Sequence, residues 1–199
     1  IELDLSKIEC MIALPMHPSN AFTIEELNAN LEDILHACEQ DVQKLIGRKD
    51  VSLDLCSKIE NGKLRVDQGV IAGCAGGLYD SIYEAASILK GHTGGCGDYA
   101  LSVYPGSQPI MVELVRTGVI HDLMASGATV RTAFCGPCFG AGDVPANDAL
   151  SIRHTTRNFP SREGSKPGNG QLSGVALMDA RSIAAATANG GILTPATDL

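Results

Sequence analysis

The sequence contains no tryptophan and only four tyrosines and four phenylalanines among its 199 residues. So few aromatic rings disfavour a surface on which nucleic-acid bases stack. The sequence also has no apolar run of membrane-spanning length and no cluster of basic residues, and its formal net charge is −8. Because an acidic surface repels phosphate backbones and anionic lipids, we expect no nucleic-acid partner and no membrane partner.

The cysteines also lack the pattern of a disulfide framework, since there are seven of them, an odd number, and they are widely spread along the sequence. A cytoplasmic chain in which some thiols act as ligands or catalytic groups fits this usage better. The chain opens with Ile1 and shows neither the basic start nor the apolar core of a signal peptide. That opening indicates processing or an excised fragment. Length and composition suit a single folded unit over residues 1–199.

Helical and strand patterns alternate along most of the chain. A capping box at Thr23 and Glu26 opens a long helix that we expect to end at Gly47. Periodicity predicts further helices at 78–89, 108–116, 119–125 and 179–188, and strands at 51–55, 66–71, 100–104, 128–134 and 150–154. This alternation predicts an α/β fold of three layers, α/β/α, around a mainly parallel sheet.

Three chemically capable residues, Cys74, Cys135 and Arg157, fall just past predicted strands. In parallel sheets the carboxyl ends of the strands meet at one edge, and ligands gather there. We therefore expect a functional site at this edge.

The C-x-x-C motif Cys135-Gly136-Pro137-Cys138 allows several interpretations. It is the motif of thioredoxins, but a redox thiol at a helix start is disfavoured because the following residues, 139–142, open a helix poorly. A zinc site needs a second ligand pair, for which only His92 and Cys96 offer themselves. Buried, inert thiols form a third possibility, which we expect for Cys10, Cys38 and Cys56.

The fourth interpretation is an iron–sulfur cluster held by Cys135, Cys138 and the distant Cys74. Cluster iron takes thiolate sulfur. Three thiolates on four irons leave one iron open as a Lewis acid for substrate. Cys74 suits the third position because it ends a strand and small residues follow it.

At these residues the chain resembles the third domain of the aconitase family, from Leu64 onward. Gly73-Cys74 is similar to the family's lone ligand, and the separation of 61 residues between Cys74 and Cys135 is close to the family's. The other matching segments are Ala133–Gly140 (Ala-Phe-Cys-Gly-Pro-Cys-Phe-Gly), Pro105-Gly106-Ser107-Gln108, the loop Arg157–Arg162 (Arg-Asn-Phe-Pro-Ser-Arg) and the tail 191–198. Four such motifs in order are far more specific than C-x-x-C alone.

The resemblance implies a [4Fe–4S] cluster on Cys74, Cys135 and Cys138. It also implies that Arg157 and Arg162 handle the carboxylates of a small hydroxy di- or tricarboxylic acid, which the enzyme dehydrates and rehydrates. Guanidinium groups suit that task because they pair with carboxylates through two parallel hydrogen bonds. We expect Asn158 and Phe159 to shape the loop and Ser107 to cap the helix that follows this serine in the sequence. Family members are much longer, so the remaining domains would come from the same or a partner chain, and the isolated chain would be inactive.

Two positions depart from the family pattern. Ala75-Gly76-Gly77 stands where aconitases carry Thr-Asn after the lone ligand cysteine, and Thr156 stands where they carry Asn. These departures put citrate as the substrate in doubt. Residues 22–57 also fit the family poorly. A non-catalytic iron- or redox-sensing module on the same fold therefore stays open. Among the histidines, only His154, at a strand end, deserves a test.

Overall fold

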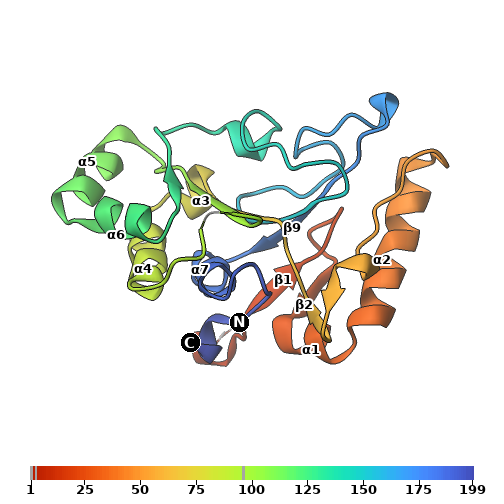
Figure 1. The fold of residues 1–199 in the computed structure, drawn as a ribbon, viewed down its shortest axis with the longest axis horizontal. Coiled ribbons are helices and arrows are strands. Elements are labelled where there is room, and N and C mark those ends of the chain that lie inside the picture. Colours follow the sequence, from red (N-terminus) through yellow and green to blue (C-terminus); the bar gives the residue numbers. More distant parts are fainter. Residues whose placement is uncertain (1, 3, 96) are drawn as a thin grey trace.

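A computed structural model describes residues 2, 4–95 and 97–199. Within that part of the chain the central sheet has seven strands in the order β2-β1-β9-β8-β5-β6-β7 (Figure 1). Its strands are β1 Met11–Ala13, β2 Ala21–Thr23, β5 Gln68–Ile71, β6 Ala100–Val103, β7 Thr129–Val130, β8 Leu150–His154 and β9 Gly174–Met178. The five strands from β9 to β7 run parallel, whereas β1 and β2 are antiparallel additions at one edge. A separate small hairpin pairs β3 Ile59–Glu60 with β4 Lys63–Leu64.

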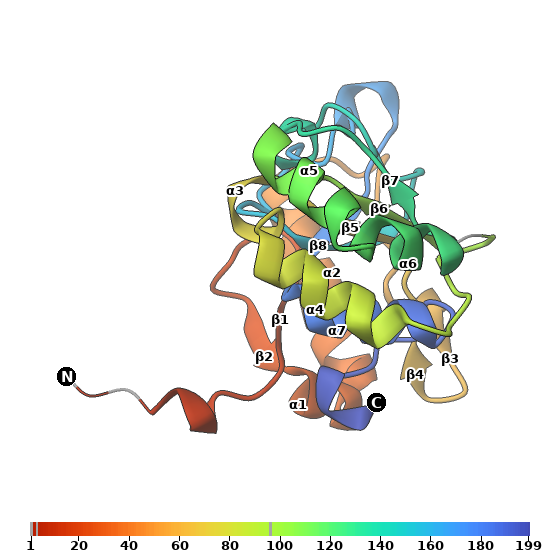
Figure 2. The same cartoon turned by 90° about the vertical axis from the view of Figure 1, so that its left-hand side faces the viewer.

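Helices cover both faces of this sheet, as the two ribbon views show (Figures 1 and 2). The side facing the viewer in Figure 2 carries α4 Tyr79–Leu89, α5 Gln108–Arg116, α6 Val119–Ala125 and α7 Ala180–Ala188. The far side carries α1 Ile24–Ala29 and α2 Leu31–Ile46. Short helical turns complete the described chain: α3 Gly73–Gly76, η1 Leu5–Lys7, η2 Cys56–Lys58, η3 Gly136–Cys138, η4 Pro167–Asn169 and η5 Ala196–Asp198. The predicted three-layer α/β/α fold with a mainly parallel sheet is confirmed.

Burial of the central strands explains why apolar residues occur on both faces of each strand. Ile71, Leu101, Ile152 and Ala176 lie on four neighbouring strands, and each is fully buried. A parallel sheet with helices on both faces removes both sides of each strand from water, so alternation with polar residues is lost.

Helix ends follow the predicted chemistry. Thr23 accepts from the Glu26 amide, and the Glu26 carboxylate accepts from the Thr23 amide in return. Ser107 accepts from the Ile110 amide at the start of α5, and Asp179 accepts from two amides at the start of α7. Gly47 ends α2 in the left-handed conformation. These caps are confirmed.

Three predicted elements differ in the structure. The single helix expected from Thr23 to Gly47 is two helices, because Asn30 leaves the helical conformation (φ −138°) and its side chain bonds back to the Glu26 carbonyl. Residues 51–55 form no strand; their alternating burial reflects side chains packed without a backbone partner. The strand expected at 128–134 covers only Thr129–Val130, because the chain then leaves the sheet edge toward Cys135.

Three strands of the sheet were not predicted from the sequence. β1 and β2 are only three residues long each, too short for a periodic signal. β9 has the sequence Gly-Val-Ala-Leu-Met directly before the Asp179 cap, and that apolar run was the available signal.

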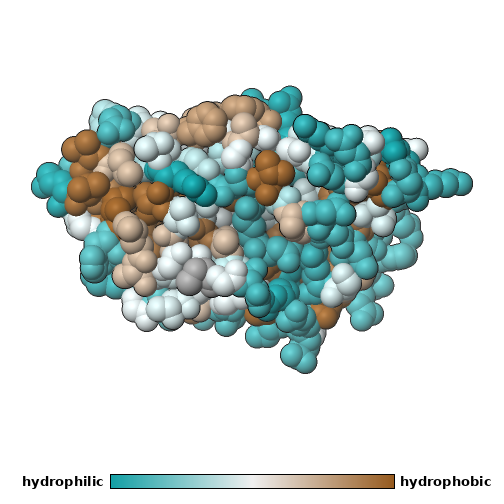
Figure 3. All heavy atoms as spheres, turned by 45° about the horizontal axis from the view of Figure 1, so that its top comes forward, coloured by the Kyte–Doolittle hydropathy of each residue, from teal (hydrophilic) through white to brown (hydrophobic). Residues whose placement is uncertain are grey.

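In the described residues, no helix is long and apolar enough to cross a membrane. One exposed apolar surface lies over α5 and α6, at the left of Figure 3. Its side chains include Val112, Val115 and Met124.

Candidate functional site

The lone cysteine lies at the carboxyl end of β5. The strand ends at Ile71, and Cys74 follows within the short helical turn α3 with its side chain exposed. Gly73 just before it has φ +73°, a left-handed conformation that glycine adopts without steric cost. This turn aims the Cys74 segment away from the core and toward the edge predicted for the site.

The paired cysteines approach the same edge from the far end of the sheet. Cys135 follows β7 by five residues and is exposed, whereas Cys138 is buried at the end of η3. A Cβ atom placed on Gly73 would lie 2.8 Å from the Cys138 Sγ atom. The two cysteine segments are therefore in direct contact, and only a glycine at 73 leaves room for that sulfur.

The three sulfurs interact electrostatically. The pKa of Cys135 is raised, first by the neighbouring Cys138, then by desolvation, and further by Cys74, while the Arg157 guanidinium acts in the opposite direction. Among the described residues, the sulfurs of Cys74, Cys135 and Cys138 do not all lie within 4.8 Å of one another. The three sulfurs are therefore not gathered as closely as the ligands of a single zinc ion, whose sulfurs lie about 4 Å apart.

A buried arginine supports the turn that carries the cysteine pair. Arg153 is 1% exposed and donates to the carbonyls of Pro137 (2.8 Å) and Asp143 (2.7 Å). It also donates to Ser151 Oγ and Gln68 Oε1. Burial lowers the pKa of Arg153 to about 10, although nearby Glu163 and Asp143 act to raise it. Sequence reasoning missed this residue; the signal was one basic residue inside the apolar strand 150–154.

Asp143 links that support to the sheet. Its carboxylate accepts from Ser102 Oγ at 3.0 Å and from the Tyr104 hydroxyl, and Arg131 lies 3.6 Å away at the surface. Because Ser102 lies on β6 and Tyr104 follows it directly, the loop after the cysteine pair is fixed to the same strand edge.

The arginine loop packs onto the cysteine turn through two glycines. A Cβ atom on Gly140 would lie 2.7 Å from the Gly164 Cα atom, so only glycines allow this backbone contact. Asn158 is buried and donates to the Leu14 carbonyl at 2.8 Å, which confirms that it shapes the loop. Arg157 and Arg162 are both exposed, and Arg157 Nη1 donates to Thr156 Oγ1. Arg157 lies close enough to Cys135 for its charge to oppose the rise in that thiol's pKa.

Gly76, one of the departures from the family pattern, is enforced by its surroundings. A Cβ atom there would lie 2.2 Å from the His154 carbonyl oxygen and 2.9 Å from the His154 Cβ atom. An asparagine at this position would force the backbone apart. His154 itself is partly buried, and burial lowers its pKa. Its Nδ1 atom has no hydrogen-bond partner among the residues that the structure describes.

The remaining cysteines test two of the alternative interpretations, inert packed thiols and a zinc site. Cys38 is buried, donates to the Pro15 carbonyl at 2.9 Å, and has its pKa raised to about 12, first by burial. The expectation of an inert packed thiol is confirmed for Cys38, but Cys10 and Cys56 are only half-buried. Of the zinc candidates, His92 is exposed and Cys96 lies outside the described residues.

Known proteins match the chain over nearly all its length. A sequence profile of the aconitase family (aconitate hydratase) matches residues 1–185. The chain belongs to the aconitase family. Its relatives include 3-isopropylmalate dehydratase large subunits from Moorella thermoacetica, 30% identical over 92% of this chain and 35% of that protein, and from Clostridium botulinum, 30% identical over 98% and 37%. The 3-isopropylmalate dehydratase large subunit of Thermoanaerobacter pseudethanolicus is 36% identical over 63% of this chain and 30% of its own length.

The chain spans about a third of the length of these aconitase-family relatives. The relatives are named as large subunits of a dehydratase. What these names state holds for the relatives themselves.

Proposed function

We propose that this chain is the cluster-binding domain of a hydro-lyase that removes and re-adds water on a small hydroxy acid. The observation that carries the proposal is the meeting of Cys74, Cys135 and Cys138 at the carboxyl edge of the parallel sheet, with Arg157 beside them. Three thiols and a cation at one edge match the chemistry that the family reaction requires.

The donor set fits a [4Fe–4S] cluster. All three donors are thiols, the ligands that such clusters take, and each is free of a disulfide. Their sulfurs are spread more widely than one ion requires. Cys74, Cys135 and Cys138 would hold the cluster, and when bound it supplies an open iron that acts as a Lewis acid toward hydroxyl and carboxylate oxygens.

The chain's own cations would orient the substrate. Arg157 has its guanidinium beside Cys135 and exposed to solvent, so it can pair with a carboxylate through two hydrogen bonds. Arg162 lies on the same loop, which the contact of Gly140 with Gly164 fixes against the cysteine turn. We assign both arginines to carboxylate binding.

The substrate we favour is a hydroxy dicarboxylic acid of the isopropylmalate type rather than citrate. Relatives named 3-isopropylmalate dehydratase support this choice. The backbone of His154 also excludes at position 76 the polar side chain that aconitases carry there. Fewer polar groups near the cluster suit a substrate with one carboxylate fewer and an apolar branch.

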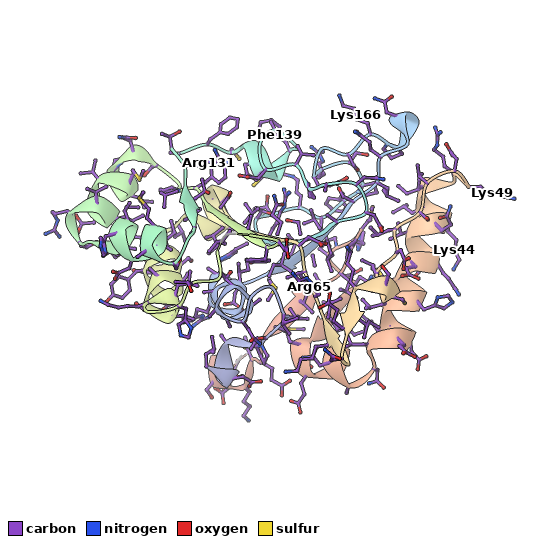
Figure 4. The ribbon with its side chains drawn as sticks, viewed as in Figure 1. Lys44, Lys49, Arg65, Arg131, Phe139 and Lys166 are labelled. Atoms are coloured by element: carbon purple, nitrogen blue, oxygen red, sulfur yellow. The ribbon has the colours of Figure 1, made fainter. Side chains whose placement is uncertain are left out.

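The reaction requires more protein than this chain. The chain covers about a third of its relatives, and the edge around the cysteines exposes Phe134 and Phe139, each about half exposed (Figure 4 labels Phe139). Remaining aconitase-type domains, on the same or a partner chain, would cover this face and exclude water from the cluster. Free thiols also favour the cytoplasm, a reducing compartment.

A thiol redox protein is disfavoured by the motif's surroundings. Reactive thiols of that class have a lowered pKa at the start of a long helix. Here η3 spans three residues, and the Cys135 pKa is raised by its neighbours.

Anaerobic reconstitution of the chain with iron and sulfide tests the cluster. We expect broad visible absorbance and about four irons per chain, lost in Cys74→Ser, Cys135→Ser and Cys138→Ser and retained in Cys10→Ser, a matched half-buried cysteine. Iron incorporation that survives Cys74→Ser, or insulin-disulfide reduction that needs only the C-x-x-C pair, would contradict the proposal. In the enzyme complete with its other domains, Arg157→Lys should raise KM for the hydroxy acid and leave cluster absorbance unchanged.

A further inference from the structure

A second group of ligand-type side chains lies on α2 and the turn that packs against it. His36 and Glu39 are one helical turn apart, and Cys56 comes from η2, which packs against α2. One ligand atom from each residue lies within 4.8 Å of the other two. Figures 1 and 2 show α2 apart from the turn that bears Cys135 and Cys138, so the two groups are separate.

We infer that His36, Glu39 and Cys56 form a binding site for a single divalent transition-metal ion of the zinc class. Imidazole, carboxylate and thiolate are the three ligand types that zinc takes in proteins. Three protein ligands leave the fourth tetrahedral position open for water or a small anion.

Hydrogen bonds already orient two of the three ligands. Glu39 Oε1 accepts from the Cys56 amide at 2.7 Å, while Oε2 faces His36 Nδ1 at 3.5 Å. The other ring nitrogen, His36 Nε2, lies 2.9 Å from the Gln40 side-chain amide. With the amide oxygen turned toward it, Gln40 would hold the proton on Nε2 and leave Nδ1 free to bind metal, as second-sphere partners of ligating histidines do.

The charge around Cys56 favours a cation. The carboxylates of Glu39, Asp54 and Glu32 lie close enough to act on the Cys56 thiol. Negative groups that oppose a bare thiolate attract a divalent ion, and the ion in turn stabilises the thiolate. Pairwise contacts also hold these side chains, since the Cys56 thiol donates to the Glu32 carbonyl at 3.9 Å and His36 faces Glu39 across one helical turn. The observation that points to a metal is that one ligand atom from each of the three residues lies within 4.8 Å of the other two.

Cobalt and zinc titrations test the site on the full chain with Cys74, Cys135 and Cys138 all replaced by serine, so that the other thiols do not compete. We expect one Co²⁺ per chain, with a thiolate-to-cobalt charge-transfer band and tetrahedral visible bands, and stoichiometric displacement by Zn²⁺. Cys56→Ser should abolish the charge-transfer band, and His36→Gln should weaken binding at least about tenfold. Cys10→Ser, the matched half-buried cysteine, should change neither.

Glu39→Gln separates metal binding from loop support, because glutamine keeps an oxygen that can accept from the Cys56 amide. We expect the variant's metal-free melting temperature to stay close to that of the parent, while its affinity for Zn²⁺ falls at least about tenfold. Absence of saturable Co²⁺ binding, or a charge-transfer band that persists in Cys56→Ser, would overturn the assignment. So would equal affinity in Glu39→Gln accompanied by a lowered melting temperature, which indicates loop support alone.

Discussion

Replacing Arg153 with methionine should loosen the turn that carries Cys135 and Cys138. The guanidinium is buried and donates to the carbonyls of Pro137 and Asp143, so methionine leaves one buried and one half-buried acceptor without this donor. Each stranded acceptor costs about 1–3 kcal/mol. Removing one member of a buried charged network costs about 3–5 kcal/mol. We therefore expect the free energy of unfolding to fall by about 3–5 kcal/mol.

Arg131 provides the matched control. It also approaches the Asp143 carboxylate, at 3.6 Å, but its side chain is 50% exposed. A surface ion pair of this kind contributes about 0–1 kcal/mol, so Arg131→Met should change stability by no more than that. Both variants remove one positive charge near Asp143, but Arg153 is buried and donates to backbone carbonyls, whereas Arg131 is half-exposed and pairs with the carboxylate at the surface.

Urea unfolding followed by circular dichroism measures both free energies, since the chain has no tryptophan for fluorescence. Labelling of thiols in the folded protein reports on the turn itself, because Cys138 is only 1% exposed and should become reactive once the turn loosens. A destabilisation of Arg153→Met within about 1 kcal/mol of that of Arg131→Met, with Cys138 still protected, would refute the reasoning.

Three further predictions concern the same edge and the helix behind it. Gly47→Ala and Gly73→Ala both place alanine at positive φ, but only at position 73 does the new Cβ meet the Cys138 sulfur, at 2.8 Å. In urea unfolding, Gly73→Ala should therefore lower the free energy of unfolding by at least about 1 kcal/mol more than Gly47→Ala does, and it should also lower cluster yield. Equal effects of the two variants would contradict the contact. Asp179→Ala should cost about 1 kcal/mol at pH 7. Burial acts to raise the Asp179 pKa, but hydrogen bonds from Ser182 and Arg181 lower it below 3.8. The stabilisation by this cap is therefore present above that pH and is lost as the pH falls below it. If Asp179→Ala lowered the free energy of unfolding equally at pH 7 and pH 3, that result would count against the cap. Among the described cysteines, a thiol reagent should label the exposed Cys74 and Cys135 first and the buried Cys38 and Cys138 last. The reverse order would contradict the burial of these side chains.

The parallel core and its capped helices could be predicted because their signals are local. Val70 to Ala72 is an apolar run at the end of β5, and Asp179 is a capping residue before a helical pattern, so neither needs knowledge of distant contacts. β1 and β2 could not be predicted, since three-residue strands exist only through pairing with each other and with β9. The break at Asn30 was equally hidden, because the apolar periodicity continues across it.

The site residues themselves were visible in the sequence, but the groups that position them were not. Cys74, Cys135 and Arg157 could be placed at one edge because each follows a parallel strand. Arg153 escaped notice because a charged residue within a strand gives no hint of the carbonyls it will meet 10 and 16 residues away in sequence. Such partners are fixed only when the loops close over the strand.

Close approaches at glycines, together with the hydrogen bonds of Arg153 and Asp143, bring the three segments of this edge together. Gly73 admits the Cys138 sulfur, Gly140 meets Gly164, and Gly77 accepts a hydrogen bond at its carbonyl from the Gly106 amide at 2.7 Å. At each contact a Cβ atom would collide with its neighbour, so none of these positions tolerates a larger residue without movement of a loop. It follows that the separation of the cysteines along the chain can vary with loop length, whereas their separation in space is set by how closely these backbones approach. An alanine at any of these glycines would therefore disturb the thiols without touching their own residues.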